Sequence, residues 1–322
     1  MPERIIGYSG FNFTEEKTRE LNELAETLGI KLREIPHRSS DVSYCSGCEA
    51  LAGDFKSSVL EAATGMRWFH SNWAGVDGLV GLSPFRERKA LLTSSSGAYN
   101  IMLAEHLLSG CLMMLRNFPV YLDAQKKHIW HEAIPAESLW NKRVTVLGVG
   151  NTGGAFARLA AAMGAKVSGL DLLRKDKPEW LVSLYSVEQL PDVLVNTEIL
   201  VMCLPYTKET DKFISAPEIA MLPKGARLLN AGRGKTLDVD ALTQALHSGH
   251  LAGAMLDVFP EEPLSPDSPL WETPNLFITP HVAGHEADKL NAEYIFNIFV
   301  ENLHRWSAGE PLVNVVNVER GF

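Results

Sequence analysis

The stretch that most constrains the fold of this chain is residues 142–171, KRVTVLGVGNTGGAFARLAAAMGAKVSGLD. Residues 144–147 are predicted to form a strand, followed by an Ala-rich helix that ends near Gly164 and a second strand that ends at Asp171. Between the first strand and the helix stands a G-x-G-x-x-G motif, formed by Gly148, Gly150 and Gly153. The motif alone is weak evidence. However, Asp171 lies 171 − 150 = 21 residues past its second glycine, which is the spacing of a dinucleotide-binding βαβ unit.

Such a turn predicts how a dinucleotide would bind. The glycines permit a tight turn and let a pyrophosphate approach the backbone at the helix N-terminus. Asp171 is expected to accept hydrogen bonds from the adenine-side ribose hydroxyls. That favours NAD, because a carboxylate repels the 2′-phosphate of NADP. Arg174 and Lys175 follow in a polar loop and keep NADP possible. The alternative is a glycine turn that binds no ligand.

Helix-like and strand-like segments alternate along the rest of the chain, which is typical of an α/β protein. A length of 322 residues suggests about two domains. Residues 15–29 place Leu21, Leu24 and Leu28 on one helix face, and strand-like segments then carry a first lobe to about Ser96. A second series opens at Arg143, and a long amphipathic helix is predicted over residues 286–309.

Residues 100–118, NIMLAEHLLSGCLMMLRNF, are apolar on nearly every side. This predicts one buried helix that joins two lobes or two subunits. About twenty polar and aromatic residues follow, including Trp130 and Trp140, and we expect them to form an arm. So much apolar surface favours a homodimer, with Trp130 near the neighbouring subunit.

The bulk composition narrows the class of protein. A net charge of −9 argues against a nucleic-acid or anionic-membrane partner. No segment has the roughly 18 consecutive apolar residues of a membrane span, and MPERIIGYSG lacks the apolar region of a signal peptide. Four cysteines make no disulfide framework, so we expect a cytoplasmic protein. Cys45 and Cys48 lack a second ligand pair, so they are interpreted as small strand-end residues and no metal is expected.

Three charged or titratable residues each follow an apolar, strand-like segment: Arg233, Glu262 and His281. Because parallel strands of one sheet end at the same edge, the three side chains are expected to gather there. Each has an ordinary alternative. Arg233 could lie in an exposed turn, Glu262 could be a solvated acid beside Glu261, and His281 could be a turn histidine.

At this point a resemblance becomes clear. The segment LPKGARLLNAGRGKTLDVDALTQALHSGHLAGAMLDVFPEEPL, with LWETPNLFITPHVAG further on, closely resembles the D-isomer-specific 2-hydroxyacid dehydrogenase family. WAGVDGL, LAEHLLSGCLMMLR, CLPYTKETDKFI and the glycine motif match as well. The resemblance implies two Rossmann-like, doubly wound parallel-sheet domains. The NAD-binding domain, residues 99–285, would be inserted into a discontinuous substrate domain of residues 1–98 and 286–322.

The resemblance also implies site residues. The catalytic Arg, Glu and His of the family fall on Arg233, Glu262 and His281. Its substrate contacts fall on Ala74, Gly75, Arg233 and His281, where the first two bind a carboxylate through backbone N–H groups. Its cofactor contacts fall on Gly148, Gly150, Asn151, Thr152, Gly153, Asp171, Cys203, Pro205, Ala231, Arg233, Asp257, His281 and Gly284. Thr152 stands where the family more often has an apolar residue.

The chemistry of these residues suits reduction of a 2-keto acid. His281 as imidazolium can donate a proton to the carbonyl oxygen, and Glu262 would favour that charged form and orient the ring. Arg233 offers a rigid fork of N–H donors for a carboxylate and the neighbouring carbonyl, and its flanking glycines are expected to leave room for ligands.

The sequence therefore predicts an NAD-dependent 2-keto-acid reductase acting on glyoxylate, hydroxypyruvate or a similar acid. The end of the chain, VNVVNVERGF, predicts no appended regulatory domain. One rival is a formate dehydrogenase, which is expected to carry Gln where Glu262 stands. Another is a non-catalytic, NAD(H)-sensing protein related to transcriptional corepressors, which would bind NADH without oxidising it.

Overall fold

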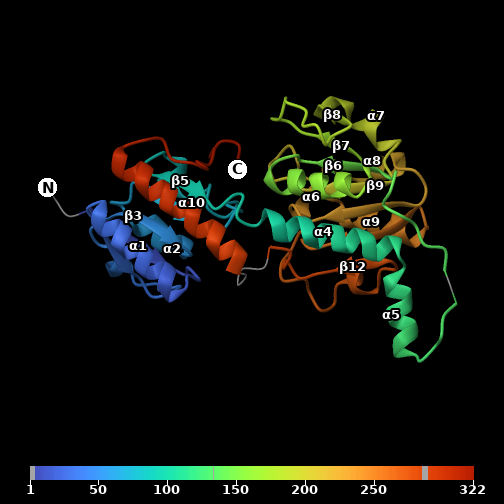
Figure 1. The fold of residues 1–322 in the computed structure, drawn as a ribbon, viewed down its shortest axis with the longest axis horizontal. Coiled ribbons are helices and arrows are strands. Elements are labelled where there is room, and N and C mark those ends of the chain that lie inside the picture. The colour runs from blue at the N-terminus through green and yellow to red at the C-terminus, as the bar shows by residue number, and fades with distance from the viewer. Residues whose placement is uncertain (1–3, 133, 285–288) are drawn as a thin grey trace. The chain divides into compact units, whose positions relative to one another are not determined.

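The computed structural model describes residues 4–132, 134–284 and 289–322. The chain divides into two compact units. Unit 1 comprises Met1–Tyr99 and His285–Phe322, and unit 2 comprises Asn100–Gly284. Each unit is an α/β layer structure built on a parallel sheet (Figure 1). The predicted fold class, two parallel-sheet α/β domains, is confirmed.

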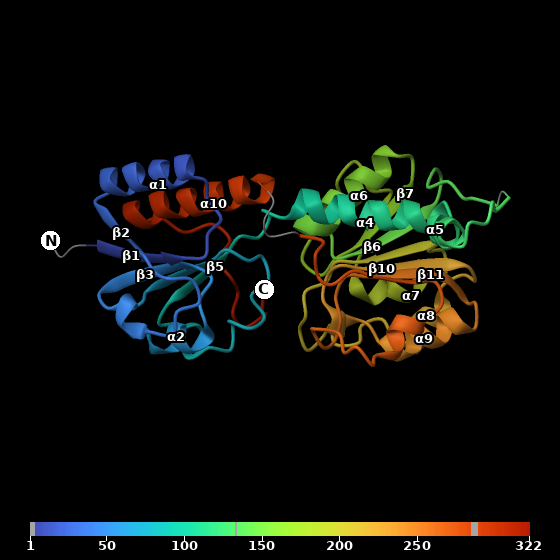
Figure 2. The same ribbon diagram turned by 90° about the horizontal axis from the view of Figure 1, so that it is seen from below.

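The sheet of unit 1 has the order β2-β1-β3-β4-β5, with all pairs parallel. Its strands are β1 (Arg4–Ser9), β2 (Ile30–Glu34), β3 (Cys48–Gly53), β4 (Trp68–Ser71) and β5 (Leu91–Ser94). Helices α1 (Glu15–Thr27) and α10 (Lys289–Ala308) cover one face, and α2 (Ser57–Ala62) lies on the other (Figure 2). A short helix, α3 (Ser83–Arg86), precedes β5.

Helix α1 shows why these residues fold as they do. The side chain of Thr14 accepts a hydrogen bond from the backbone N–H of Lys17 and caps the helix start. Leu21 and Ala25 are buried one turn apart, and they pack in a cluster with Ile6, Trp68 and the α10 residues Phe296 and Phe299. Gly29, at φ +67°, follows the C-cap residue Leu28, a position where glycine is favoured.

The sheet of unit 2 has the order β12-β11-β10-β9-β6-β7-β8, again parallel throughout. Its strands are β6 (Arg143–Leu147), β7 (Lys166–Leu170), β8 (Ser183–Tyr185), β9 (Ile199–Met202), β10 (Ala226–Asn230), β11 (Leu251–Leu256) and β12 (Leu276–Ile278). The order of the strands reverses between β6 and β9. In open α/β sheets, ligands bind outside the carboxyl ends of the strands at such a switch point.

Helices cover both faces of the second sheet (Figure 2). Helices α4 (Asn100–Leu115) and α6 (Asn151–Ala162) lie on one face. On the other face lie α7 (Leu190–Leu194), α8 (Ala216–Met221) and α9 (Val239–His247). Each face therefore buries its own apolar cluster against the sheet.

The prediction of one continuous helix over residues 100–118 is wrong. Helix α4 ends at Leu115, and a separate helix, α5 (Phe118–Lys126), follows. The break lies at Asn117, whose φ of 56° is left-handed and cannot continue an α-helix. Helix α4 is also buried on only one side, because Ile101 remains 38% exposed and Glu105 is exposed as well.

The predicted arm consists of α5 and the residues that lead to β6, and we call residues 118–142 the arm. It extends away from the rest of unit 2 in Figure 1. Trp130 is 94% exposed. Trp140 instead lies over Gly164, since a Cβ placed there would overlap its ring. Further large apolar side chains are exposed on the arm, namely Phe118, Val120, Leu122 and Ile129.

The cysteine pair differs from its predicted placement. Cys48 begins β3, but Cys45 ends a 3-10 helix, η1 (Val42–Cys45), rather than a strand. Both thiols are buried, and burial raises the pKa of Cys45 to about 11, so it stays a protonated, unreactive thiol. Within the described ranges, no group of three or more His, Cys, Asp or Glu residues could hold a metal ion. Nor, among those residues, is any helix long and apolar enough to span a membrane.

Candidate active site

The glycine turn after β6 is built by close backbone contacts. Gly148 has φ +84°, and a Cβ there would lie 2.8 Å from the carbonyl oxygen of Cys203 in the loop after β9. A Cβ on Gly153 would overlap the carbonyl oxygen of Gly148. At Gly150, by contrast, no heavy atom of the described residues comes within 4 Å of an added Cβ. Two glycines therefore shape the turn, and the space beside Gly150 is open to a ligand at the start of α6.

Asp171 follows β7 and is tied to the same turn. One oxygen of its carboxylate accepts a hydrogen bond from the backbone N–H of Val149 at 2.7 Å. The other oxygen accepts from the N–H groups of Leu173 and Arg174, each at 2.8 Å. Besides its predicted role toward a ribose, the carboxylate thus anchors the glycine turn to the end of β7. The sequence analysis missed this anchoring role.

The cations after Asp171 have acceptors on the glycine turn and in their own loop. The guanidinium of Arg174 donates to the carbonyl oxygen of Val149 at 3.0 Å and pairs with Asp176 at 3.3 Å. The ammonium group of Lys175 donates to the carbonyl oxygen of Leu172 at 3.1 Å. Both side chains therefore already have acceptors within this loop.

Across the switch point, the loop after β9 carries Cys203 and Pro205. Burial raises the pKa of the Cys203 thiol to about 12, so this wall of the site is uncharged. The hydroxyl of Thr210 donates to the carbonyl oxygen of Pro205 at 2.8 Å and closes the loop on itself. The loop is thus held rigidly beside the glycine turn.

Arg233 follows β10, and its flanking glycines pack closely against neighbouring loops. A Cβ on Gly232 would lie 2.6 Å from the carbonyl oxygen of Leu204, and one on Gly234 would overlap the backbone of Phe259. The glycines let the β10 loop pack against its neighbours after β9 and β11. The Arg233 carbonyl accepts from the hydroxyl of Thr236 at 2.6 Å and the amide of Asn230 at 3.2 Å, which fixes the backbone from which the guanidinium projects.

Glu262 and His281 lie in contact. Strands β10, β11 and β12 are neighbours in one parallel sheet, as expected, so the loops that carry Arg233, Glu262 and His281 leave the same edge. His281 Nδ1 lies 2.7 Å from Glu262 Oε2, and the other oxygen of Glu262 accepts from the backbone N–H of Phe259 at 2.8 Å. A carboxylate oxygen only accepts, so Nδ1 carries a hydrogen and Nε2 is left for another partner.

Asp257 organises the backbone around His281. Its carboxylate is 2% exposed and accepts hydrogen bonds from the N–H groups of Val282 and Ala283, both at 3.0 Å. The N–H of His281 donates to the carbonyl oxygen of Asp257 at 2.8 Å. His281 itself has φ 53°, a conformation that a non-glycine residue adopts at a cost and that needs support from its surroundings.

The other predicted site residues are distributed as follows. Asn151 and Thr152 open α6, and the N–H of Ala231 donates to the carbonyl oxygen of Met202 at 3.2 Å. Gly284 is the last described residue before the gap at 285–288. Ala74 and Gly75 belong to unit 1, in the loop after β4. Unit 2 alone therefore brings together the glycine turn, Asp171, Arg233 and the Glu262–His281 pair.

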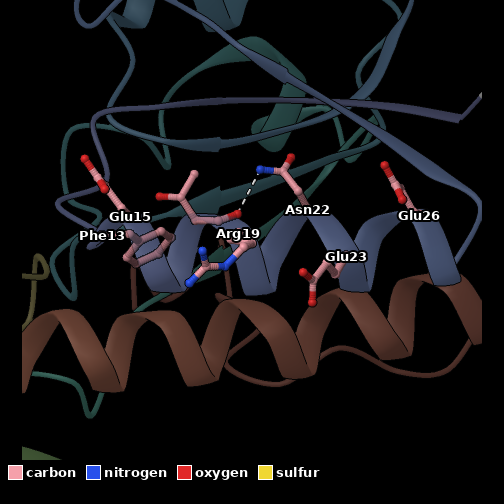
Figure 3. Close-up of a pocket in the computed structure, with 7 residues that line it drawn as sticks. Phe13, Glu15, Arg19, Asn22, Glu23 and Glu26 are labelled. Carbon is pink, nitrogen blue, oxygen red and sulfur yellow. Dashed lines mark hydrogen bonds between the residues drawn. The ribbon is translucent and has the colours of Figure 1, made fainter.

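Unit 1 has a surface hollow along α1, shown in Figure 3, that does not suit a 2-keto acid. It is lined by Phe13, Glu15, Thr18, Arg19, Asn22, Glu23 and Glu26. Asn22 donates to the carbonyl oxygen of Thr18 at 2.8 Å, so its amide is used within the helix. Three carboxylates against one guanidinium disfavour an anionic ligand.

Comparison with known proteins decides the family. The sequence profile described as D-isomer specific 2-hydroxyacid dehydrogenase, NAD binding domain, matches residues 108–283. The chain belongs to this family. The matched residues include the glycine turn, the Asp171 loop and all three of Arg233, Glu262 and His281.

Individual relatives agree with that assignment. Glyoxylate/hydroxypyruvate reductase A of Klebsiella pneumoniae is 31% identical over 256 residues, which cover 77% of this chain and 80% of that protein. D-3-phosphoglycerate dehydrogenase of Haemophilus influenzae is 32% identical over 191 residues, 58% of this chain. The match spans 46% of that longer enzyme.

Among solved structures, a D-isomer specific 2-hydroxyacid dehydrogenase from Xanthobacter autotrophicus Py2, in complex with NADPH and MES, has a TM-score of 0.82. It is 31% identical, and the match covers 99% of each chain. The similarity therefore extends over unit 1 as well as the profile-matched part of unit 2.

Proposed function

We propose that this protein reduces a 2-keto acid to a D-2-hydroxy acid with a nicotinamide dinucleotide, and that Arg233, Glu262 and His281 are its catalytic residues. The observation that carries the proposal is the 2.7 Å contact between His281 Nδ1 and Glu262 Oε2 at the sheet edge from which the Arg233 loop also leaves. Membership of the family and the reductase names of its relatives support the same chemistry.

His281 supplies the proton. Reduction adds a hydride to the carbonyl carbon and a proton to the carbonyl oxygen, so that C=O becomes CH–OH. Because Glu262 accepts the Nδ1 hydrogen, the proton held at Nε2 is the one that His281 gives to the substrate. The neighbouring carboxylate holds the Nδ1 side of the ring and so orients Nε2. The Phe259 N–H holds the far oxygen of Glu262 and keeps the pair aligned.

Arg233 binds the substrate. Its planar guanidinium can donate two parallel hydrogen bonds to a carboxylate and polarise the adjacent carbonyl oxygen. The backbone contacts of Gly232 and Gly234 fix the stem of this side chain. Ala74 and Gly75 remain predicted carboxylate contacts through their backbone N–H groups.

The glycine turn suits a dinucleotide. The open space beside Gly150 leaves room for a pyrophosphate at the start of α6, with Asn151, Thr152 and Gly153 around it. Asp171 would face the adenine-side ribose, Cys203 and Pro205 the adenine side, and Ala231, Asp257 and Gly284 the nicotinamide. When bound, the dinucleotide supplies the hydride.

The proposal is tested by following NADH absorbance with glyoxylate, hydroxypyruvate, pyruvate, a branched 2-keto acid and phenylpyruvate. We expect turnover with at least one acid and formation of the D-hydroxy acid. Comparing kcat/KM across the panel identifies the substrate class. Absence of turnover with every acid, under conditions in which NADH binds, would contradict the proposal.

Glu262→Gln is predicted to lower kcat/KM for reduction by about tenfold or more. The amide replaces the carboxylate oxygen that accepts the Nδ1 hydrogen of His281 at 2.7 Å, so the ring loses a charge-assisted hydrogen bond that orients it. The measurement is kcat/KM at one fixed pH. The matched control is Glu261→Gln, whose exposed side chain is adjacent in sequence. A Glu262→Gln enzyme with wild-type kcat/KM would remove Glu262 from the mechanism.

We propose NADH as the preferred cofactor, although a solved relative is in complex with NADPH. Asp171 is fixed by three backbone N–H groups, and its charge would repel a 2′-phosphate. Arg174 donates to the Val149 carbonyl oxygen on the glycine turn and pairs with Asp176, and Lys175 bonds within its own loop. Asp171→Ser should raise the NADPH/NADH ratio of kcat/KM at least about tenfold, whereas Asp267→Ser, at an exposed acid in the loop after β11, should not. A wild-type preference for NADPH would overturn this prediction.

We propose a two-fold homodimer that covers α4 and the arm. The exposed apolar side chains there, with Trp130 at 94% exposure, make a surface that is costly to leave in water. Light scattering at micromolar concentration should give twice the chain mass of 35.5 kDa. Trp130→Glu should shift the protein toward the monomer, whereas Trp271→Glu, at a side chain 49% exposed elsewhere in unit 2, should not. A monomeric wild type would refute the dimer.

A further inference from the structure

Another histidine of unit 2, His106, lies close to Asp257 at the sheet edge where β11 ends. It stands on α4, one turn before Gly110. A Cβ on Gly110 would overlap Met255 of β11, so the helix approaches this strand closely. That approach brings His106 Nε2 to 3.1 Å from the hydroxyl oxygen of Thr279 and 3.8 Å from Oδ1 of Asp257.

The direction of each hydrogen bond in this group follows from the chemistry. The Thr279 hydroxyl lies 2.6 Å from Asp257 Oδ1. A carboxylate only accepts, so the single hydroxyl hydrogen points to Asp257. Thr279 must then accept from His106, which therefore carries its hydrogen on Nε2. Burial lowers the pKa of His106, although the nearby Asp257 carboxylate opposes that effect. The Nε2–H donates to Thr279 whether the ring is neutral or charged.

The chain of hydrogen bonds ends on the backbone that carries His281. Asp257 Oδ1 accepts from Thr279 and from the N–H of Val282, and Oδ2 accepts from the N–H of Ala283. A carboxylate that is 2% exposed depends on its donors, because burying a charge is costly unless it is hydrogen-bonded. Removing one donor leaves the carboxylate under-satisfied and loosens its hold on the others.

We infer that His106 and Thr279 are positioning residues. Through Asp257 they hold the backbone of residues 281–283, with His281 at φ 53°, in the arrangement that presents His281 to the substrate. The inference rests on the proposed role of His281 in proton donation. His106 would position the backbone of His281 through Asp257, a role separate from those of the three proposed catalytic residues.

The test combines two variants with two readouts. Thr279→Val removes the hydroxyl at nearly constant shape, and His106→Leu removes the donor. In each, mass spectrometry of hydrogen exchange should show about tenfold faster exchange of the peptide that covers residues 279–284. In each, kcat for keto-acid reduction should fall about tenfold with little change in KM, because proton transfer depends on alignment.

A double-mutant cycle distinguishes a positioning role from general destabilisation of the protein. The double variant should lose no more kcat than either single variant, since both act through one chain of bonds. Thr279→Ser, which keeps the hydroxyl, should restore both readouts. His250→Leu is the matched control, because this histidine bonds the Ile219 carbonyl at 3.0 Å in a distant part of unit 2. If Thr279→Val fails to fold, His106→Leu and Thr279→Ser carry the test.

Each outcome is decisive. Unchanged exchange in residues 279–284 would overturn the inference, and so would faster exchange with unchanged kcat or additive losses in the double variant. Hydrogen exchange can be measured without turnover. If the wild-type protein reduces no keto acid, the proposed function is refuted, but the exchange rates still test the hydrogen bonds among His106, Thr279 and Asp257.

Discussion

His281→Ala should reduce the rate of 2-keto-acid reduction by about 10²–10⁴-fold, the usual contribution of a positioned proton donor. The affinity for NADH should stay close to that of wild type. His281 is 52% exposed and bonded through Nδ1 to Glu262, so its removal leaves the glycine turn and the Asp171 anchor untouched. The measurement is kcat by NADH absorbance, with the NADH Kd from fluorescence titration.

His247→Ala is the matched control for that variant. This histidine is exposed at the end of α9 and bonds only within its own helix, to the carbonyl oxygen of Thr243 at 2.9 Å. It should keep wild-type kcat. A His281→Ala enzyme that turns over at nearly the wild-type rate would remove His281 as proton donor.

Gly153→Ala and Gly150→Ala should both weaken NADH binding by about tenfold or more, but for different reasons. A methyl group on Gly153 would overlap the Gly148 carbonyl oxygen, so the turn must move, and overpacking of this kind costs about 1–3 kcal/mol. Of the described atoms, none lies near a methyl group on Gly150. That methyl would instead occupy the approach of the pyrophosphate.

The pair is therefore distinguished by stability. Gly153→Ala should lower the Tm of the protein without ligand, whereas Gly150→Ala should leave it nearly unchanged. Calorimetry measures the Tm of each variant, and fluorescence titration measures its affinity for NADH. Wild-type NADH affinity in Gly150→Ala would show that the open space at this glycine is not where the dinucleotide approaches.

Periodic and local features of the sequence predicted most of the fold. The glycine motif with its flanking strands located β6, α6 and β7, and three apolar strand segments located the loops of Arg233, Glu262 and His281 on one sheet edge. These predictions succeed because hydrophobic period and glycine spacing depend on neighbours along the chain. The end of α4 was missed because Arg116 and Asn117 can also be polar positions on a continuous helix, and the hydrophobic period does not reveal the left-handed backbone of Asn117.

Contacts between distant side chains and backbone could not be predicted in the same way. The bonds of Asp171 to Val149 and of Asp257 to Val282 join residues 22 and 25 positions apart, and no periodicity records them. The packing role of Gly232 and Gly234 became visible only when their neighbours, Leu204 and Phe259, were placed. His106 gave no signal beyond its position in an apolar helix, because its partner Thr279 is 173 residues away.

The most direct test of the central claim compares binding with turnover in one preparation. NADH is first titrated to show that the protein binds it. Each 2-keto acid is then added, and NADH oxidation and D-2-hydroxy-acid formation are measured together. The account predicts one hydroxy acid formed for each NADH oxidised, over many turnovers, with loss of turnover in His281→Ala. NADH that binds but is never oxidised by any acid would instead indicate a dinucleotide-sensing protein and contradict the proposed reductase.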